Sequence, residues 1–126
     1  MTRAIAIALL LLGCADAETV TALVPRAPAT QRERLRDDAR LVLEANCGQC
    51  HIHDYDTALP RALAVFDLSE LEWSAHMSDV QLIDAAGRVA GRRGPDGPLE
   101  IDDDDVARVR VFVDEEIALR QSQGPS

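Results

Sequence analysis

Two cysteines and a histidine stand together near the middle of the chain, in the run Cys47-Gly48-Gln49-Cys50-His51. Thiols can add across an activated double bond or bind a soft metal, and a neutral imidazole is a common metal ligand. Three kinds of chemistry use such residues together: covalent attachment of a c-type haem, dithiol redox exchange, and zinc binding. The spacing of the run distinguishes between them.

The spacing favours covalent haem attachment. Two residues between the cysteines let both thiols reach one porphyrin edge and add to its vinyl groups, while the adjacent His51 reaches the iron. A thioredoxin-like dithiol opens a helix after a strand, and no strand is predicted before Cys47. Zinc would need a fourth ligand and usually a second paired cluster. We therefore expect one haem c, attached through Cys47 and Cys50, with His51 as the proximal iron ligand.

The elements on both sides of the run are predicted to be helical. Residues 31–46 contain no Gly or Pro, and their apolar side chains recur at helical spacing, so a first helix should run directly into Cys47. Residues 51–78 show no long period and are interrupted by Pro60, which predicts a wrapping loop with a short helical turn at 61–65.

Two further helices are predicted after this loop. One covers Val80 to about Ala90, capped by Ser78 or Asp79, and a glycine-rich turn ends it. The other begins at the acidic run 102–105, because the start of a helix favours negative charge, and its apolar stripe continues to Ile117.

In this order of elements, residues 31–121 resemble the cytochrome c-like domain family. The resemblance implies a small all-α fold of about three main helices wrapped around one covalent haem. It implies single-electron transfer, not an enzyme that makes bonds in a substrate. It also implies that Phe112, on the closing helix, packs against the first helix.

The sixth iron ligand departs from the family's usual pattern. A Met normally lies between the second and last helices, but the corresponding residues 91–101 contain none. Met77, the only Met beyond the initiator, is the expected distal ligand, and its thioether would stabilise reduced iron. His76, His53 and an open position are the alternatives. Trp73, one helical turn before Met77, is expected either in the core or facing the haem.

An open sixth position would suit other functions. A haem-based sensor of small ligands needs such a position, and a peroxidase-like enzyme needs it together with a distal acid–base group, for which His76 is the candidate. Whatever the sixth ligand is, arginine side chains could pair with the haem propionates. Four arginines are candidates: Arg61, Arg88, Arg92 and Arg93.

Composition limits the core and the partners. Aromatic residues are 3% of the chain, so the core must be mostly aliphatic unless a large apolar group such as haem contributes to it. The basic residues are 13 arginines with no lysine, against 22 acidic residues, for a net charge of −9. This balance argues against nucleic-acid binding through basic patches and suggests a redox partner with a basic docking surface.

The first residues are typical of an export signal. Arg3 precedes an apolar run too short to span a bilayer, and Leu11-Leu12-Gly13-Cys14 resembles the bacterial lipobox, which implies cleavage before Cys14 and lipidation of its thiol. The expected organisation is a signal peptide at 1–13, a tether at 14–30 and the domain at 31–126. Anchoring would be on the periplasmic side, with the outer membrane favoured. Cleavage after Ala17, giving a soluble periplasmic protein, is the alternative.

Changing Cys14 to Ser should move the protein from the membrane fraction to the soluble fraction, because the lipidated thiol is lost. Cell fractionation with immunoblotting measures this, and Thr21→Ser in the tether serves as the control. Membrane association that persists in Cys14→Ser would contradict the lipid anchor.

Overall fold

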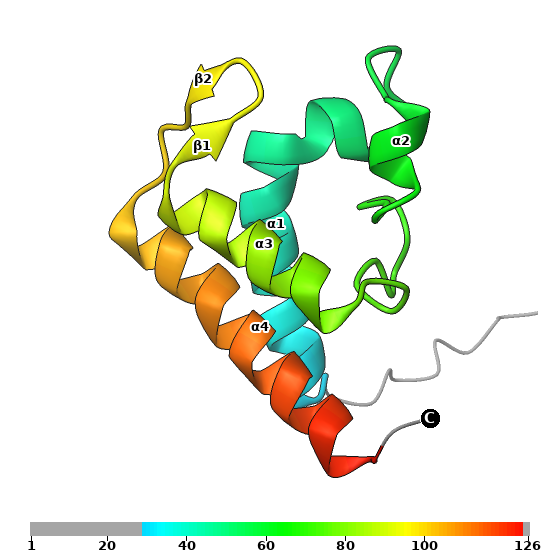
Figure 1. The fold of residues 1–126 in the computed structure, drawn as a ribbon, viewed down its shortest axis with the longest axis vertical. Coiled ribbons are helices and arrows are strands. Elements are labelled where there is room, and N and C mark those ends of the chain that lie inside the picture. Colours follow the sequence, from blue (N-terminus) through cyan, green and yellow to red (C-terminus); the bar gives the residue numbers. More distant parts are fainter. Residues whose placement is uncertain (1–28, 125–126) are drawn as a thin grey trace, which may run out of the picture.

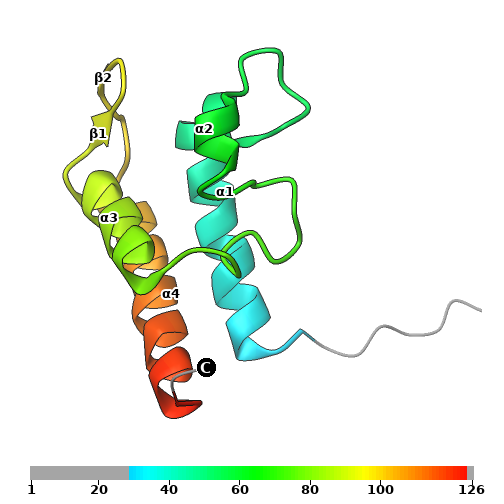
Figure 2. The same cartoon turned by 45° about the vertical axis from the view of Figure 1, so that its right-hand side comes forward.

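Four helices and a two-strand hairpin make up residues 29–124, the part of the chain described by the computed structural model (Figure 1). In chain order they are α1 (Gln31–His51), α2 (Pro60–Leu63), α3 (Asp79–Ala90), β1 (Arg93–Gly94), β2 (Gly97–Pro98) and α4 (Asp103–Ser122). α4 packs along both α1 and α3. In the turned view, α3 and α4 form one layer, and α1, α2 and the connecting loops form the other (Figure 2).

Side-chain caps fix where the three long helices begin, and the capping residues are Thr30 for α1, Ser78 for α3 and Asp102 for α4. The Ser78 hydroxyl accepts from the backbone N–H of Gln81, whose side chain accepts from the N–H of Ser78 in return. This capping box satisfies backbone donors that the first turn of a helix leaves unpaired. The structure thus selects Ser78 over Asp79 as the cap of α3.

The predicted helices are confirmed, with differences at their ends. α1 continues through the Cys-x-x-Cys-His run to His51, and α4 continues past Ile117 to Ser122. The short turn predicted at 61–65 is α2, which begins at Pro60, a favoured residue for the first position of a helix. The glycine-rich turn contains the hairpin, which was not predicted. In that hairpin Arg93 pairs with Pro98 and Gly94 with Gly97.

The core lies between α1, α3, α4 and the loop that follows α2. Trp73 and Phe112 are its largest fully buried side chains, with ring centroids 5.2 Å apart. Phe112 is 1% exposed and belongs to the same buried cluster as Ala39 and Leu43 of α1, as the sequence predicted. The rest of this cluster is mainly aliphatic, in line with the aromatic-poor composition.

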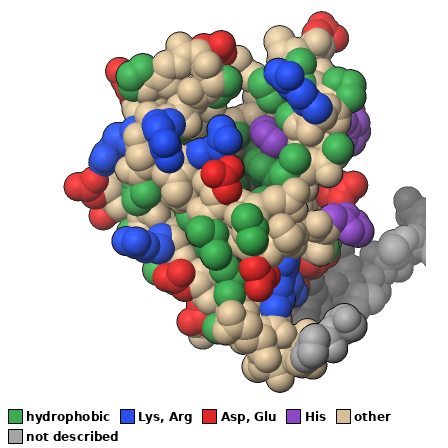
Figure 3. All heavy atoms as spheres, in the orientation of Figure 1, with side chains coloured by type: hydrophobic (Ala, Val, Ile, Leu, Met, Phe, Trp, Pro, Cys, Tyr) green, Lys and Arg blue, Asp and Glu red, His purple; other side chains and the backbone are tan. Residues whose placement is uncertain are grey.

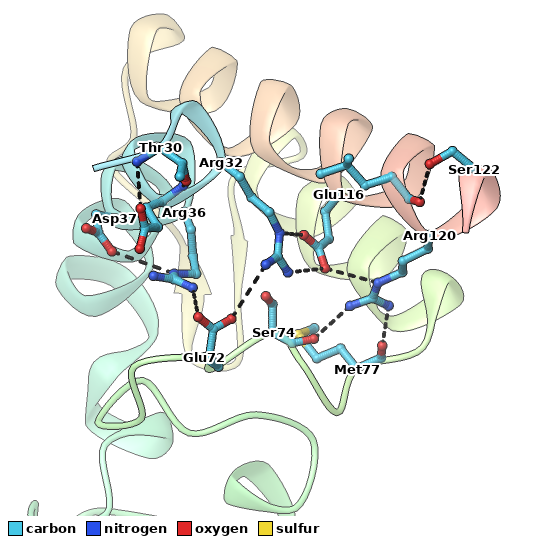
Figure 4. A network of polar contacts seen from close by, with 12 residues as sticks. Thr30, Arg32, Arg36, Asp37, Glu72, Ser74, Met77, Glu116, Arg120 and Ser122 are labelled. Carbon is cyan, nitrogen blue, oxygen red and sulfur yellow. Dashed lines mark hydrogen bonds and ion pairs between the residues drawn. The ribbon is translucent and has the colours of Figure 1, made fainter. Parts of the chain in front are cut away.

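A network of arginines and carboxylates joins α1, α4 and the loop beside this core (Figure 4). The Glu116 side chain is 3% exposed and accepts from Arg32 at 2.8 and 3.0 Å and from Arg120 at 3.1 Å. On the other side, Arg36 of α1 pairs with Glu72 of the loop. A buried carboxylate is stable only when it is paired in this way.

The predicted leader, Cys14, the alternative cleavage site at Ala17 and nearly all of the tether lie outside the described residues. Within residues 29–124, none of the helices has the length and apolar character needed to span a bilayer.

The Glu116 network should make stability depend on acid pH. Burial acts to raise the pKa of Glu116, but the hydrogen bonds and charges of Arg32 and Arg120 outweigh it and hold the pKa below its ordinary value. This stabilisation is therefore complete above the unfolded pKa of about 4.3 and is lost as the pH falls through the folded value.

Glu116→Gln should lower the free energy of unfolding by about 1–3 kcal/mol at pH 7 and weaken its decline between pH 5 and 3. Denaturant unfolding across this pH range measures both effects. Glu115→Gln, an exposed neighbour on α4, is the matched control. An unchanged pH dependence in Glu116→Gln would contradict this assignment.

Candidate functional site

The last turn of α1 carries the three residues of the Cys-x-x-Cys-His run that could bind a ligand. Cys47, Cys50 and His51 are three and four residues apart, so their side chains share one face of the helix. All three line an open cavity of about 950 Å³ between the end of α1, α2, α3 and the hairpin. Ligand pockets usually measure about 300–1,000 Å³, so this cavity is large enough for a bulky cofactor.

The walls of this cavity are largely apolar. Leu43, Val65, Val89 and Leu99 contribute from α1, the loop, α3 and the segment after the hairpin. In the space-filling view, hydrophobic side chains gather in a hollow whose rim carries arginines and acidic residues (Figure 3). An apolar interior with charged groups at its mouth suits a bulky apolar ligand that carries polar substituents.

His51 is held in a geometry suited to binding a metal. Its Nδ1 lies 3.0 Å from the backbone oxygen of Phe66, and its ring stacks on the Phe66 ring with centroids 3.8 Å apart. A carbonyl can only accept, so Nδ1 must carry the proton and Nε2 keeps its lone pair. Burial lowers the pKa of His51 despite this hydrogen bond, which favours the neutral imidazole. Histidines that bind metals are commonly oriented by such a carbonyl.

The end of α1 is also fastened to the loop through the backbone. The N–H of Leu68 donates to the carbonyl of His51 at 2.8 Å, which satisfies one acceptor left free at the end of the helix. Together with the Phe66 contact, this bond fixes the loop against the last turn of α1. The position of His51 therefore depends on residues 15 and 17 places further along the chain.

The environment of Cys47 disfavours a role for this thiol as a redox nucleophile. Burial, with a smaller contribution from Cys50, raises the pKa of the Cys47 thiol. Catalytic dithiols need a lowered pKa so that a thiolate is available at neutral pH. Both cysteines are free thiols, and within residues 29–124 no cluster of three or more His, Cys, Asp or Glu could hold a metal ion.

Met77 is brought to the same cavity as His51. Its side chain is 3% exposed and lines the cavity just before α3 begins. Neither of the other histidines is brought there: His76 is exposed, and His53 is exposed and pairs with Asp67 and Asp54 at 2.8 and 2.9 Å. Among the side chains considered as a distal ligand, only Met77 lines the same cavity as the Cys-x-x-Cys-His run.

Trp73 lies in the core and is not among the residues that line the cavity. Its ring is 5.8 Å from that of Phe66 and 5.2 Å from that of Phe112, centroid to centroid. The Nε1 atom is buried without a hydrogen-bond partner among the described residues. The core interpretation of Trp73 is therefore confirmed.

The four candidate arginines are separated by the structure. Arg61, Arg88 and Arg93 line the cavity, and Arg88 also pairs with Asp84 at 2.8 Å. Arg92 does not line it. Its backbone has a φ of 48°, and its side chain bonds the Ile101 carbonyl and Asp103 instead, tying the hairpin region to α4.

Sequence reasoning missed the hairpin as part of the cavity wall. Residues 93–99 all line the cavity, and Gly97 has a φ of 140°, which side chains rarely tolerate. The run Gly94-Pro95-Asp96-Gly97 carries the signal, since alternating Gly and Pro residues favour a tight turn.

No protein-family model matches the chain, and comparisons with curated proteins and with solved structures gave no significant match. The site must therefore be interpreted from its own geometry.

Proposed function

We propose that this protein is an exported monohaem c-type cytochrome that carries single electrons. The observation that carries the proposal is the placement of His51: its Nε2 is left available beside Cys47 and Cys50 in a large apolar cavity that Met77 also lines. The donor set of two thiols, an imidazole and a thioether matches the groups that attach and ligate a c-type haem.

Each residue then has a defined role. Cys47 and Cys50 would form the two thioether bonds, and His51 and Met77 would be the proximal and distal ligands of the iron. The haem supplies one-electron redox chemistry when it is bound. The largely apolar walls of the cavity would contact the haem, and burial lowers the pKa of His51, so that a neutral nitrogen would be offered to the metal.

Arginines at the cavity would bind the propionates. Arg61 and Arg93 line the cavity, and Arg88 does so while paired with Asp84. A guanidinium can form two parallel hydrogen bonds with a carboxylate, so these three residues are suited to orient the haem. Arg92 is assigned no such role because its guanidinium is bound to Ile101 and Asp103.

The arrangement of elements supports a cytochrome c-like fold. A first helix ending in the attachment run, a wrapping loop, a helix, a glycine-rich turn and a closing helix follow one another, and α4 packs on α1. The chain departs from the usual pattern in one respect. The expected ligand lies before α3, and the segment that usually carries the ligand forms a hairpin wall without a Met.

The proposed setting is the periplasmic side of a membrane, with anchoring through lipidated Cys14. Without Arg3, 12 arginines face 22 acidic residues, which gives a net charge of −10 for the processed chain. Docking to a redox partner with a basic surface should then weaken as salt rises.

Changing both Cys47 and Cys50 to Ala should abolish covalent haem, because the attachment run then has no thiol to form the thioether bonds. Haem staining after denaturing electrophoresis, with the protein expressed beside haem-maturation machinery, measures this. Cys14→Ser is the matched control and should keep the stain. Stain retained in the double variant would overturn the proposed function.

Changing Met77 to Ala should convert six-coordinate low-spin iron to a high-spin or water-bound form. We expect the weak oxidised band near the red edge of the visible spectrum to vanish and carbon monoxide to bind the reduced protein. His76→Ala, at the exposed neighbour, should leave the spectrum unchanged. A wild-type spectrum that is already high-spin and responds to carbon monoxide would favour the sensor or peroxidase-like alternative.

A further inference from the structure

The segment that carries Met77 has little regular structure of its own. Between α2 and α3 the backbone forms isolated turns, such as those from Ala75 N–H to Glu72 and from Met77 N–H to Ser74, at 2.8 and 3.1 Å. A segment of this kind has few internal hydrogen bonds to hold its place, so its position depends on contacts with other elements.

Arg120 of α4 makes the most extensive of these contacts. Its Nη2 donates to the carbonyl of Ser74 at 2.9 Å, and its Nη1 donates to the carbonyl of Met77 at 2.6 Å and to Asp79 at 3.2 Å. Arg120, 43 residues after Met77 in the sequence, thus binds the backbone carbonyls of both Met77 and Ser74 (Figure 4).

Arg120 is itself fixed in direction by a buried carboxylate. Its Nε donates to Glu116 at 3.1 Å, and Glu116 also accepts two hydrogen bonds from Arg32 of α1. The Glu116 side chain is 3% exposed, and burial of this charged acceptor strengthens the bonds that it receives. The guanidinium therefore cannot easily turn away from the loop.

We propose that Arg120 is a positioning residue for Met77, holding the thioether at the cavity through the backbone of its segment. This inference rests on the proposed role of Met77 as an iron ligand. A distal ligand on an irregular segment is released whenever that segment opens, so the contacts that close the segment also set how often the sixth position is exposed.

An arginine suits this role better than a lysine. Its Nε and two Nη atoms point in fixed, different directions, and here they serve Glu116 and two backbone carbonyls at once. A lysine ammonium would keep the charge near Glu116 but has a single nitrogen. Arg120→Lys should therefore give a partial effect and Arg120→Gln a full one.

The test compares Arg120→Gln and Arg120→Lys with wild type in the full-length holoprotein. Imidazole, which binds iron only when the sixth position opens, is the probe, and its binding rate is followed in the visible spectrum. We expect Arg120→Gln to raise that rate at least about tenfold, the effect of losing one hydrogen bond to a charged group. Arg120→Lys should give an intermediate rate.

A second measurement does not depend on haem. Hydrogen exchange of the backbone amides of residues 70–78, followed by mass spectrometry, should become faster in Arg120→Gln than in wild type. Arg110→Gln, at an exposed arginine on the same helix, is the charge-matched control and should change neither measurement. Val109→Ala, at a buried α4 position that does not line the cavity, is the control for loss of global stability.

Each failure has a distinct outcome. Absence of covalent haem in wild type would refute the proposed function, and no change in imidazole binding in Met77→Ala would refute the ligand role of Met77 on which this inference rests. If Met77→Ala binds imidazole faster but Arg120→Gln does not, the positioning role is wrong. It is also wrong if Val109→Ala, at an equal loss in melting temperature, has the same effect as Arg120→Gln. Should Arg120→Gln fail to fold, wild-type rates and exchange in Arg120→Lys would overturn the proposal.

Discussion

A buried carboxylate, Glu116, links the parts of this protein that must stay together for a site to exist. It accepts hydrogen bonds from Arg32 of α1 and Arg120 of α4, and Arg120 extends the contact to the backbone around Met77. Burying a charge is costly unless partners surround it, so the first and last helices can pack here only in the register that brings both arginines to Glu116. The same register also positions the loop that connects α2 to α3, because Arg120 binds its backbone.

Around that junction the helices leave a cavity on one side and a packed core on the other. Trp73 and Phe112 lie in the core with mainly aliphatic neighbours, and Cys47, Cys50 and His51 line the cavity. Met77 belongs to the core cluster and also lines the cavity. Small domains bury a limited share of their apolar surface, and this chain has few aromatic residues with which to build a larger core. A large apolar cofactor would complete the interior, which agrees with the haem proposal.

The loop after α1 joins these two regions. The Phe66 ring stacks on His51, and the Phe66 carbonyl accepts a hydrogen bond from Nδ1 of His51. The Phe66 ring also lies close to Trp73 in the core. The orientation of the expected iron ligand is thus tied to core packing. Metal sites depend on such outer contacts as well as on the ligands themselves, because these contacts choose the tautomer and the direction of the ring.

The sequence by itself determined the local features. The spacing of Cys47, Cys50 and His51 puts them on one helical face, and residue periodicity and capping residues located three long helices, because both are properties of neighbouring residues. Only the tertiary structure showed that Met77 is buried and lines the cavity while its neighbour His76 is exposed, since their loop has no period to show which side is buried. It also decided which arginines reach the cavity and that Glu116 joins Arg32 to Arg120. Pairings across 84 residues follow from how the helices pack, which no local pattern records.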